Sequence, residues 1–399
     1  MSISNEHLIL IECCKNIFLR ENFDQINKIL NSKKINYKYL LNLSLEHRVS
    51  PILYDVLINN SFIIHEFPQY FINCLSHRTL MTKKENCYKN AALSEMLKEA
   101  DRRNIKIIGI KGVALSISTY SSCRVERESR DIDILLESKD IEEICIILKN
   151  LGYVQGVYNI KKNKICNAVN EAIAEYEEQQ PNHVWPFYRY TDLKNYALVI
   201  EPHRSIAYKN NPYQISTDEI IRCAYRSKEN IYIPCLEHEM LILCLSAFYD
   251  YSSLENMKVK SDIRLRKYCD ILNLSLRLNS DKKWNSFKKI MRENNCTFPV
   301  YQILNFCEEL FDISIIPDDF FNEEKFSNDD KYLIYNISDF ASNKPIGRWN
   351  YGFKEIFSDD NRYIHALDLL FCNCINTHYS CVRTLRQEGT FLRLRESND

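Results

Sequence analysis

The chain has 399 residues, of which 45% are hydrophobic and 26% are charged. This composition is typical of globular proteins and argues against disorder, and the length predicts two or three domains. The formal net charge of -1 gives no overall attraction to polyphosphate, so charge does not indicate nucleic acid as a partner, although it does not exclude it.

No run of 18 apolar residues occurs in the sequence, and we expect no signal peptide, so we predict no membrane partner and a cytoplasmic location. The 16 cysteines include several with apolar neighbours, such as Cys145, Cys244, Cys269 and Cys307. In a long chain of this kind they are expected to be reduced and buried, as small apolar residues of the core.

The first region, 1–103, is predicted to be helical. Apolar residues recur at helical spacing from Leu8 to Leu45, and Thr79 to Arg103 predicts a long helix. The adjacent Cys13 and Cys14 fit core packing better than a disulfide. Because no catalytic grouping is evident here, a helical platform is the favoured interpretation.

Strands and helices alternate in the second region, 104–207, which predicts a catalytic core on a small mixed sheet. Lys161 to Gln180 is polar and helix-like, and it is either a lid or an insertion. The predicted strands are Ile105 to Ile110, Asp131 to Leu136, Tyr153 to Tyr158, Val184 to Tyr190 and Tyr196 to Glu201, and the predicted helices are Val113 to Thr119 and Lys139 to Leu151.

The chain after 207 is predicted to be helical again. Glu237 to Tyr249 and Arg264 to Leu278 predict two helices of a region spanning 208–312, and 313–399 is interpreted as a helical extension of unknown role. The whole chain is therefore assigned to the α+β class, with a small mixed sheet flanked by N-terminal and C-terminal helical regions.

The last thirty residues contain two groups of chemically notable side chains. Cys372, Cys374, His378 and Cys381 have residue types that bind metals, but their spacing is not a usual zinc pattern, so buried thiols are favoured. The basic residues Arg383, Arg386, Arg393 and Arg395, with Phe391 among them, would contact an anionic acceptor or lie on a solvated helix end.

The residues with the clearest chemical signal are two aspartates at the start of a predicted strand. Asp131 and Asp133 flank one isoleucine, so their side chains leave the strand on the same face. Two carboxylates this close repel each other unless a cation lies between them, and oxygen ligands beside phosphate favour Mg²⁺. A solvated polar strand face would show the same pattern. The upstream turn at Lys111-Gly112, followed by a helix, predicts an adjacent phosphate site.

These aspartates belong to a longer pattern made of Lys111-Gly112, Ala114-Leu115, Tyr120, Arg127 and the run from Arg130 to Leu135. The pattern resembles that of the uncharacterised nucleotidyltransferases of the DNA-polymerase-β-like superfamily, in which a Lys-Gly turn precedes an Arg-x-x-x-Asp-φ-Asp strand, where φ is apolar. The resemblance covers roughly residues 30 to 310. The wider superfamily has Gly-Ser or Gly-Gly at the position of Lys111-Gly112.

The resemblance implies nucleotidyl transfer by two-metal chemistry. Asp131, Asp133 and Glu201 would bind two Mg²⁺ ions, with Mn²⁺ as an alternative. Lys111 and Gly112 would contact the β- and γ-phosphates of a nucleoside triphosphate.

Three further cationic residues and one histidine each have more than one interpretation. Arg127 or Arg130 would neutralise charge on pyrophosphate, although a structural salt bridge explains either arginine equally well. Lys267 would contact the phosphates or the base of the nucleotide, or would only lie on the solvent-exposed face of its helix. His203, two residues after Glu201, would orient Glu201, contact substrate or cap the strand, and it receives no assigned role.

The predicted function is a metal-dependent nucleotidyltransferase. It would transfer a nucleoside monophosphate from a nucleoside triphosphate such as ATP to an acceptor and release pyrophosphate. The acceptor is unidentified and would be a small molecule, peptide, protein or RNA. Two alternatives stay open, a non-catalytic nucleotide-binding module and a toxin-like enzyme that modifies tRNA 3′ ends.

Overall fold

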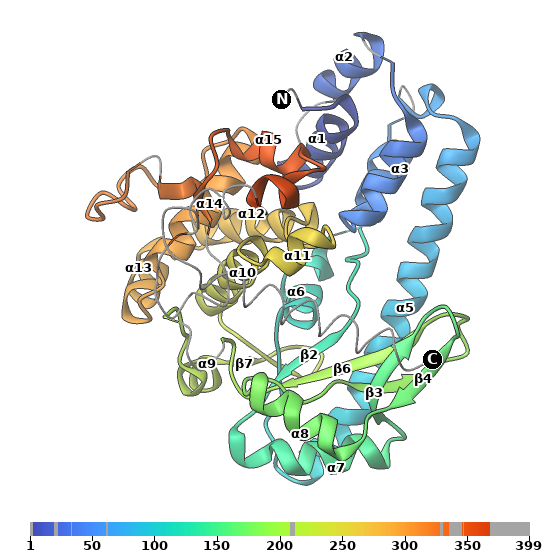
Figure 1. Cartoon of the computed structure of the whole chain (residues 1–399), viewed down its shortest axis with the longest axis vertical. Coiled ribbons are helices and arrows are strands. Elements are labelled where there is room, and N and C mark those ends of the chain that lie inside the picture. The colour runs from blue at the N-terminus through green and yellow to red at the C-terminus, as the bar shows by residue number, and fades with distance from the viewer. Residues whose placement is uncertain are drawn as a thin grey trace.

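A computed structural model describes residues 3–19, 23–32, 34–60, 63–123, 125–207, 212–327, 330–334, 345 and 347–367. Within these ranges, a mixed eight-stranded sheet lies at one end of the molecule, and most of the N-terminal and C-terminal helices gather at the other (Figure 1). The predicted α+β class with flanking helical regions is confirmed. The predicted thiol group from Cys372 to Cys381 and the basic residues from Arg383 to Arg395 lie outside the described residues.

The N-terminal region is helical, as predicted. The long helix α5 begins at Gln69 instead of Thr79, because Pro68 occupies its N-cap and no glycine or proline interrupts the next turns. Figure 1 shows α5 running along one side of the molecule, from the helical end to the sheet. The helices are α1 (Asn5–Leu19), α2 (Asp24–Ser32), α3 (Tyr37–Glu46), α4 (Ser50–Ile58) and α5 (Gln69–Arg102).

The central sheet has the strand order β4-β3-β5-β6-β2-β1-β8-β7. At its centre β2 pairs in parallel with β6 and antiparallel with β1. The strands are β1 (Ile108–Gly109), β2 (Ile132–Leu135), β3 (Val154–Asn159), β4 (Lys164–Asn167), β5 (Phe187–Tyr190), β6 (Ala197–His203), β7 (Tyr225–Arg226) and β8 (Tyr232–Ile233), and the helices within this region are α6 (Gly112–Ser118), α7 (Ile141–Asn150) and α8 (Asn170–Gln179).

Two predicted elements of this region differ from the structure. The predicted strand from Ile105 to Ile110 is reduced to β1, because the chain turns into α6 at Lys111. The polar segment from Lys161 to Gln180 is only half helical, since its first part forms β4 and a hairpin with β3. Gly156 permits this hairpin, because a Cβ at that position would lie 2.2 Å from the carbonyl oxygen of Cys166.

The C-terminal half matches the predicted helices at Glu237 to Tyr249 and Arg264 to Leu278, which are α10 and α12. A small antiparallel pair, β9 (Leu333–Ile334) and β10 (Gly347–Arg348), interrupts the region predicted to be helical after 312. The helices are α9 (Thr217–Cys223), α10 (Leu236–Tyr251), α11 (Leu254–Lys258), α12 (Leu265–Ser280), α13 (Trp284–Glu293), α14 (Thr297–Phe311) and α15 (Phe353–Ser358).

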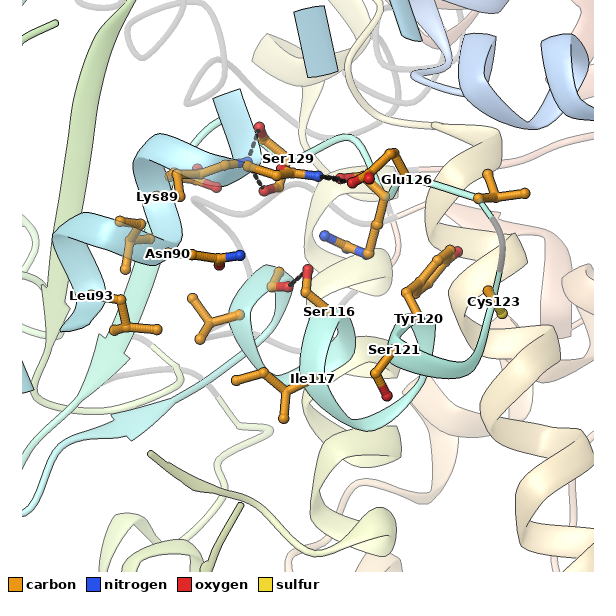
Figure 2. Close-up of a pocket in the computed structure, with 17 residues that line it drawn as sticks. Lys89, Asn90, Leu93, Ser116, Ile117, Tyr120, Ser121, Cys123, Glu126 and Ser129 are labelled. Atoms are coloured by element: carbon orange, nitrogen blue, oxygen red, sulfur yellow. Dashed lines mark hydrogen bonds between the residues drawn. The ribbon is translucent and has the colours of Figure 1, made fainter. Parts of the chain in front are cut away.

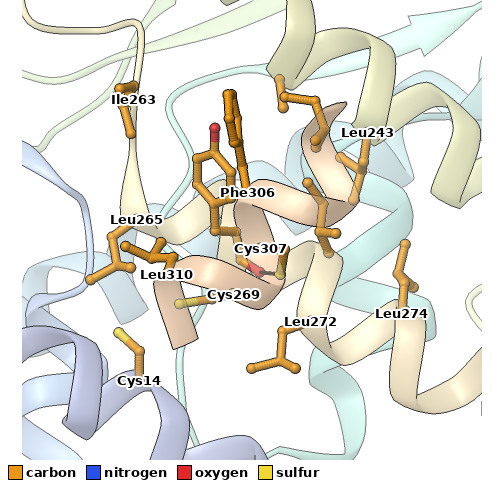
Figure 3. Close-up of a cluster of buried hydrophobic side chains, with 14 of the residues drawn as sticks. Cys14, Leu243, Ile263, Leu265, Cys269, Leu272, Leu274, Phe306, Cys307 and Leu310 are labelled. Carbon is orange, nitrogen blue, oxygen red and sulfur yellow. Dashed lines mark hydrogen bonds between the residues drawn. The ribbon is translucent and has the colours of Figure 1, made fainter. Parts of the chain in front are cut away.

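Two hydrophobic clusters lie on opposite faces of the sheet. One joins α1, α4, α10, α12 and α14, and Figure 3 shows Cys14 of α1 facing Cys269 of α12 within it. The other packs α5 and α7 against the far face of the sheet. Strand β2 divides them, since Leu135 belongs to the first cluster and its neighbours Ile134 and Leu136 to the second. Asp133 shares its face with Leu135, so it points toward the helical side.

The buried positions of Cys13, Cys14, Cys244, Cys269 and Cys307 confirm that these thiols are core residues, whereas Cys145 is only half-buried. Every helix in the described parts of the chain is too short or too polar to cross a bilayer. The predicted boundaries at 103, 207 and 312 stay predictions. What the packing establishes is that the first four helices share one core with α10, α12 and α14.

Candidate active site

Strands β2 and β6 bring acidic side chains together across their parallel pairing. Asp133 lies directly opposite Glu201 in the register of the two strands. Side chains alternate along a strand, so His203 shares the face of Glu201. Ligand atoms of Asp133, Glu201 and His203 all lie within 4.8 Å of one another. The structure thus places the predicted third acid beside Asp133.

Asp133 is the most tightly held member of this group. Its Oδ1 accepts hydrogen bonds from Nζ of Lys111 at 2.8 Å and from Nε2 of His203 at 2.9 Å. Burial alone would raise the pKa of Asp133, but the charge of Lys111 and the contact with His203 hold this pKa well below its ordinary value. Asp133 is therefore an ionised, oriented carboxylate at neutral pH.

Glu201 has the opposite electrostatic environment. Burial, followed by the negative charges of Asp131 and Asp133, raises the pKa of Glu201 to about 8. A buried carboxyl group beside two other carboxylates is in an environment that a divalent cation relieves.

The donor set at this position fits a hard divalent cation. Carboxylate oxygens are the preferred ligands of Mg²⁺ and Mn²⁺, and His203 adds a nitrogen that suits Mn²⁺ better than Mg²⁺. His203 was not among the predicted ligands, and the predicted set of Asp131, Asp133 and Glu201 stays a prediction. Asp131 lies in the same cleft and acts on Glu201 through its charge.

Lys111 has an unusual backbone at the end of β1. Its φ of 50° and ψ of -115° lie in a region that glycine tolerates and other residues rarely adopt. This is the position at which the wider superfamily carries a glycine. A backbone of this kind costs about 1–3 kcal/mol. The conformation brings Nζ of Lys111 to Asp133, and the predicted contact with phosphates stays a prediction.

Arg127 forms a buried ion pair with a residue of helix α12. Its Nη2 and Nε bond to the two carboxylate oxygens of Asp270 on α12, at 2.7 and 3.2 Å. Tyr120 donates a further hydrogen bond to Asp270 at 2.8 Å. Within the described ranges Nη1 is buried with no hydrogen-bond partner, and it lies 3.1 Å from where a Cβ on Gly112 would be. The structural salt bridge, one of the two interpretations of this arginine, is therefore present.

The other predicted phosphate ligands line the same cleft. Arg130 is exposed at its edge. Lys267 contacts the carboxylate of Asp250 and donates to Oγ of Ser246 at 2.8 Å. Burial lowers the pKa of Lys267, while Asp250 opposes this change. Their predicted contacts with a nucleotide stay predictions.

Three arginines that the sequence analysis did not select complete the cleft. Arg48 follows α3, and Arg264 and Arg266 lie at the start of α12. In the part of the chain that the structure describes, none of the three forms an ion pair, and Nε of Arg266 is buried without a hydrogen-bond partner. Burial and the charge of Arg264 lower the pKa of Arg48 to about 10, and burial and the charge of Arg127 lower that of Arg266 to about 10. These guanidinium groups lack a counter-ion.

The cleft is large and locally positive, although the whole chain is not. Its volume is about 900 Å³. Such a surface binds anions, and the arginines present planar, fixed donors that match phosphate. A weak sequence signal existed in the run Arg264-Leu265-Arg266-Lys267. The lining includes the cations Arg48, Lys111, Arg127, Arg130, Arg264, Arg266 and Lys267, and the acids Asp131, Asp133, Glu201 and Asp250.

A smaller cavity of about 310 Å³ lies between α5 and α6 and shares Asp131 with the cleft (Figure 2). Lys89 reaches across it from α5, and its Nζ donates to Oγ of Ser129 at 2.6 Å and to the Ser129 carbonyl at 2.9 Å. Burial lowers the pKa of Lys89 to about 8. This contact fixes the backbone two residues before Asp131 and so helps to position that carboxylate.

Residues 33–312 match the model of a family described as uncharacterised nucleotidyltransferase. The chain belongs to this family. No curated protein and no solved structure matches the chain. The matched range contains every residue of the site described above, and membership of a nucleotidyltransferase family supports nucleotidyl transfer from a nucleoside triphosphate. A family so described leaves the acceptor open.

Proposed function

We propose that the protein transfers a nucleoside monophosphate from a nucleoside triphosphate to a hydroxyl group of an acceptor. The observation that carries the proposal is the meeting of Asp133 and Glu201 in a cleft that is also lined by arginines without an ion pair among the described residues, namely Arg48, Arg130, Arg264 and Arg266. In the reaction the acceptor hydroxyl gives up its proton to solvent, its oxygen forms a bond to the α-phosphorus, the bond from that phosphorus to the β-phosphate oxygen breaks, and pyrophosphate leaves. The protein contributes position and charge and no covalent intermediate.

Mg²⁺ or Mn²⁺ would be held by Asp133 and Glu201, with Asp131 and His203 beside them. A bound divalent ion supplies charge neutralisation at the phosphates and lowers the pKa of a nearby hydroxyl. Two ions, as the superfamily resemblance implies, are part of this proposal. The chain's own contribution is the pair of contacts from Lys111 and His203 that keep Asp133 ionised and fixed.

The triphosphate would lie against Arg264, Arg266 and Lys267 at the start of α12. Arg266 is 8% exposed and has no ion-pair partner among the described residues, so its burial destabilises the folded protein. An anionic ligand relieves that cost, because opposite charges stabilise each other strongly where water is excluded. Arg130, at the open edge, would contact the leaving pyrophosphate.

A labelling assay tests the proposal. The full chain is incubated with Mg²⁺ or Mn²⁺ and each nucleoside triphosphate labelled at the α-phosphate, and label is then sought on the protein, on RNA and on small metabolites. Asp133→Asn and Glu201→Gln should each reduce transfer by at least about a hundredfold, because each removes a charge needed at the reacting phosphate. The matched control is Glu137→Gln, which removes a half-buried carboxylate just after β2 that pairs with Lys139.

Label that persists in the Asp133→Asn, Glu201→Gln double variant would show that these carboxylates do not serve the reaction. Binding of nucleoside triphosphate without any transfer, to every acceptor class tested, would favour the non-catalytic module instead.

A further inference from the structure

The active-site cleft continues along the sheet into a second cavity, the tyrosine pocket, whose volume is about 210 Å³. On β6, Val199 and Ala197 lie on the same face as Glu201. Val199 lines both cavities, and Tyr188, which pairs with it from β5, also lines both. A ligand in the tyrosine pocket would therefore adjoin the carboxylates.

Three tyrosines line the tyrosine pocket. Tyr158 lies on β3, Tyr188 on β5 and Tyr196 just before β6, and all three are half-buried. The hydroxyl of Tyr158 donates to Asn163 at 2.5 Å, which fixes the orientation of this ring. Partly exposed tyrosine rings held by a sheet are suited to stack against a flat ring of a ligand.

Glu128 lines the same pocket and has one unsatisfied acceptor. Its Oε1 accepts a hydrogen bond from Arg78 at 2.8 Å, whereas its Oε2 is buried and has no partner among the described residues. Glu128 is 7% exposed. A buried carboxylate oxygen left unpaired is costly, so a ligand that donates an N–H to it would gain affinity.

Two arginines mark the junction between the tyrosine pocket and the main cleft. Arg48 and Arg130 line both cavities, and within the described ranges neither forms an ion pair. They supply positive charge beside the ring-binding wall. The pocket thus offers stacking surfaces, one acceptor for an N–H group and an adjoining anion site.

We infer that the tyrosine pocket is a nucleobase subsite, in which a base stacks on the tyrosines, donates an N–H to Glu128 and places its phosphate near Arg48 and Arg130. A flat ring that carries both an N–H donor and a nearby phosphate is a nucleotide, whereas a peptide aromatic side chain lacks the anion. The inference rests on the proposed function. The nucleotide is either the donor triphosphate or a nucleotide-bearing acceptor, and one experiment separates the two.

The experiment measures the dissociation constants of three probes by calorimetry with the full chain. The probes are the four nucleoside triphosphates with Ca²⁺, tripolyphosphate alone, and the four nucleoside monophosphates in the presence of saturating tripolyphosphate. Tyr158→Leu and Glu128→Gln are compared with wild type. Tyr225→Leu, an exposed tyrosine on the opposite edge strand β7, is the matched control.

If the donor base occupies the pocket, each variant should weaken triphosphate binding about tenfold and leave tripolyphosphate binding unchanged. If the acceptor occupies it, the same loss should appear for monophosphate binding and not for the triphosphates. Both results support a nucleobase subsite and name its occupant. The control variant should change none of these constants.

The inference is overturned if wild type binds nucleotides and neither variant changes any of these constants by more than about twofold. Glu128 also pairs with Arg78, so if Glu128→Gln loses its thermal transition, Tyr158→Leu alone decides. A wild-type chain that binds no nucleotide and transfers no label removes the proposed function itself. The two failures are therefore distinguishable.

Discussion

The buried pair of Arg127 and Asp270 offers a quantitative test of how the catalytic core is joined to the helical region. The side chains are 3% and 0% exposed, and the pair is bidentate. Replacing Arg127 by methionine leaves the carboxylate of Asp270 buried, with Tyr120 as its one remaining side-chain donor among the residues that the structure describes. Breaking one side of such a pair costs about 3–5 kcal/mol, because the remaining charge is uncompensated.

The corresponding shift in thermal midpoint follows from chain length. The entropy of unfolding is roughly 2 cal/mol/K per residue, so for 399 residues the expected loss in Arg127→Met is about 4 to 6 °C. The double variant Arg127→Met, Asp270→Leu should recover most of this loss, since it removes both charges together. Arg226→Met is the control, because it breaks an exposed pair with Asp101 and should change the midpoint by less than about 1 °C.

Differential scanning calorimetry gives the midpoints, and the labelling assay is run on each variant. A double variant that is stable and still transfers nucleotide would show that Arg127 is structural. A double variant that is stable but inactive would show that Arg127 contacts the nucleotide as well. A single variant as stable as wild type would refute the electrostatic reasoning.

Three other substitutions test separate features. Burial raises the pKa of Glu239 from 4.5 to about 7, so the stability gained from its protonation is present below pH 4.5 and lost as pH rises through 7. The free energy of unfolding of Glu239→Gln should therefore exceed that of wild type by about 3 kcal/mol at pH 8 and match it near pH 4.5. Equal free energies of unfolding at both pH values would contradict this. Arg266→Met should raise the thermal midpoint by about 3 °C, because it removes a buried cation that has no ion-pair partner among the described residues. Calorimetry should also show that the variant binds tripolyphosphate about tenfold more weakly. An unchanged affinity for tripolyphosphate would show that Arg266 is not part of the anion site. Gly156→Ala should cost about 1–3 kcal/mol in calorimetry, since the new Cβ meets the Cys166 carbonyl, and a neutral effect would mean that the hairpin adjusts freely.

Local sequence patterns predicted the parts of the site that lie on single strands. The spacing of Asp131 and Asp133 gave their shared face, and the alternation along 197–203 put Glu201 and His203 on one side. The direct pairing of Asp133 with Glu201 could not be derived from spacing, because parallel strands far apart in the sequence carry no local signal of register. The family resemblance supplied that link.

The missed residues belong to elements that reach the cleft only through tertiary packing. Arg48 follows a helix of the N-terminal region, and Arg264 and Arg266 begin α12, more than 120 residues after Asp131. A charged residue near a helix end is usually solvated, so the sequence favoured no binding role for them. The hairpin of β4 was missed because Lys161 to Gln180 is mostly polar and has little strand periodicity.

The shared core of α1 and α14 has a consequence for the order in which this protein matures on the ribosome. Ile9 and Leu10 of α1 pack in the same cluster as Phe306 and Leu310 of α14. Roughly 280 residues separate the two helices, and at typical translation rates they take about 15 to 55 seconds to be made. During that interval the apolar face of α1 has no native partner from α14, so the nascent chain presents a surface suited to chaperone binding.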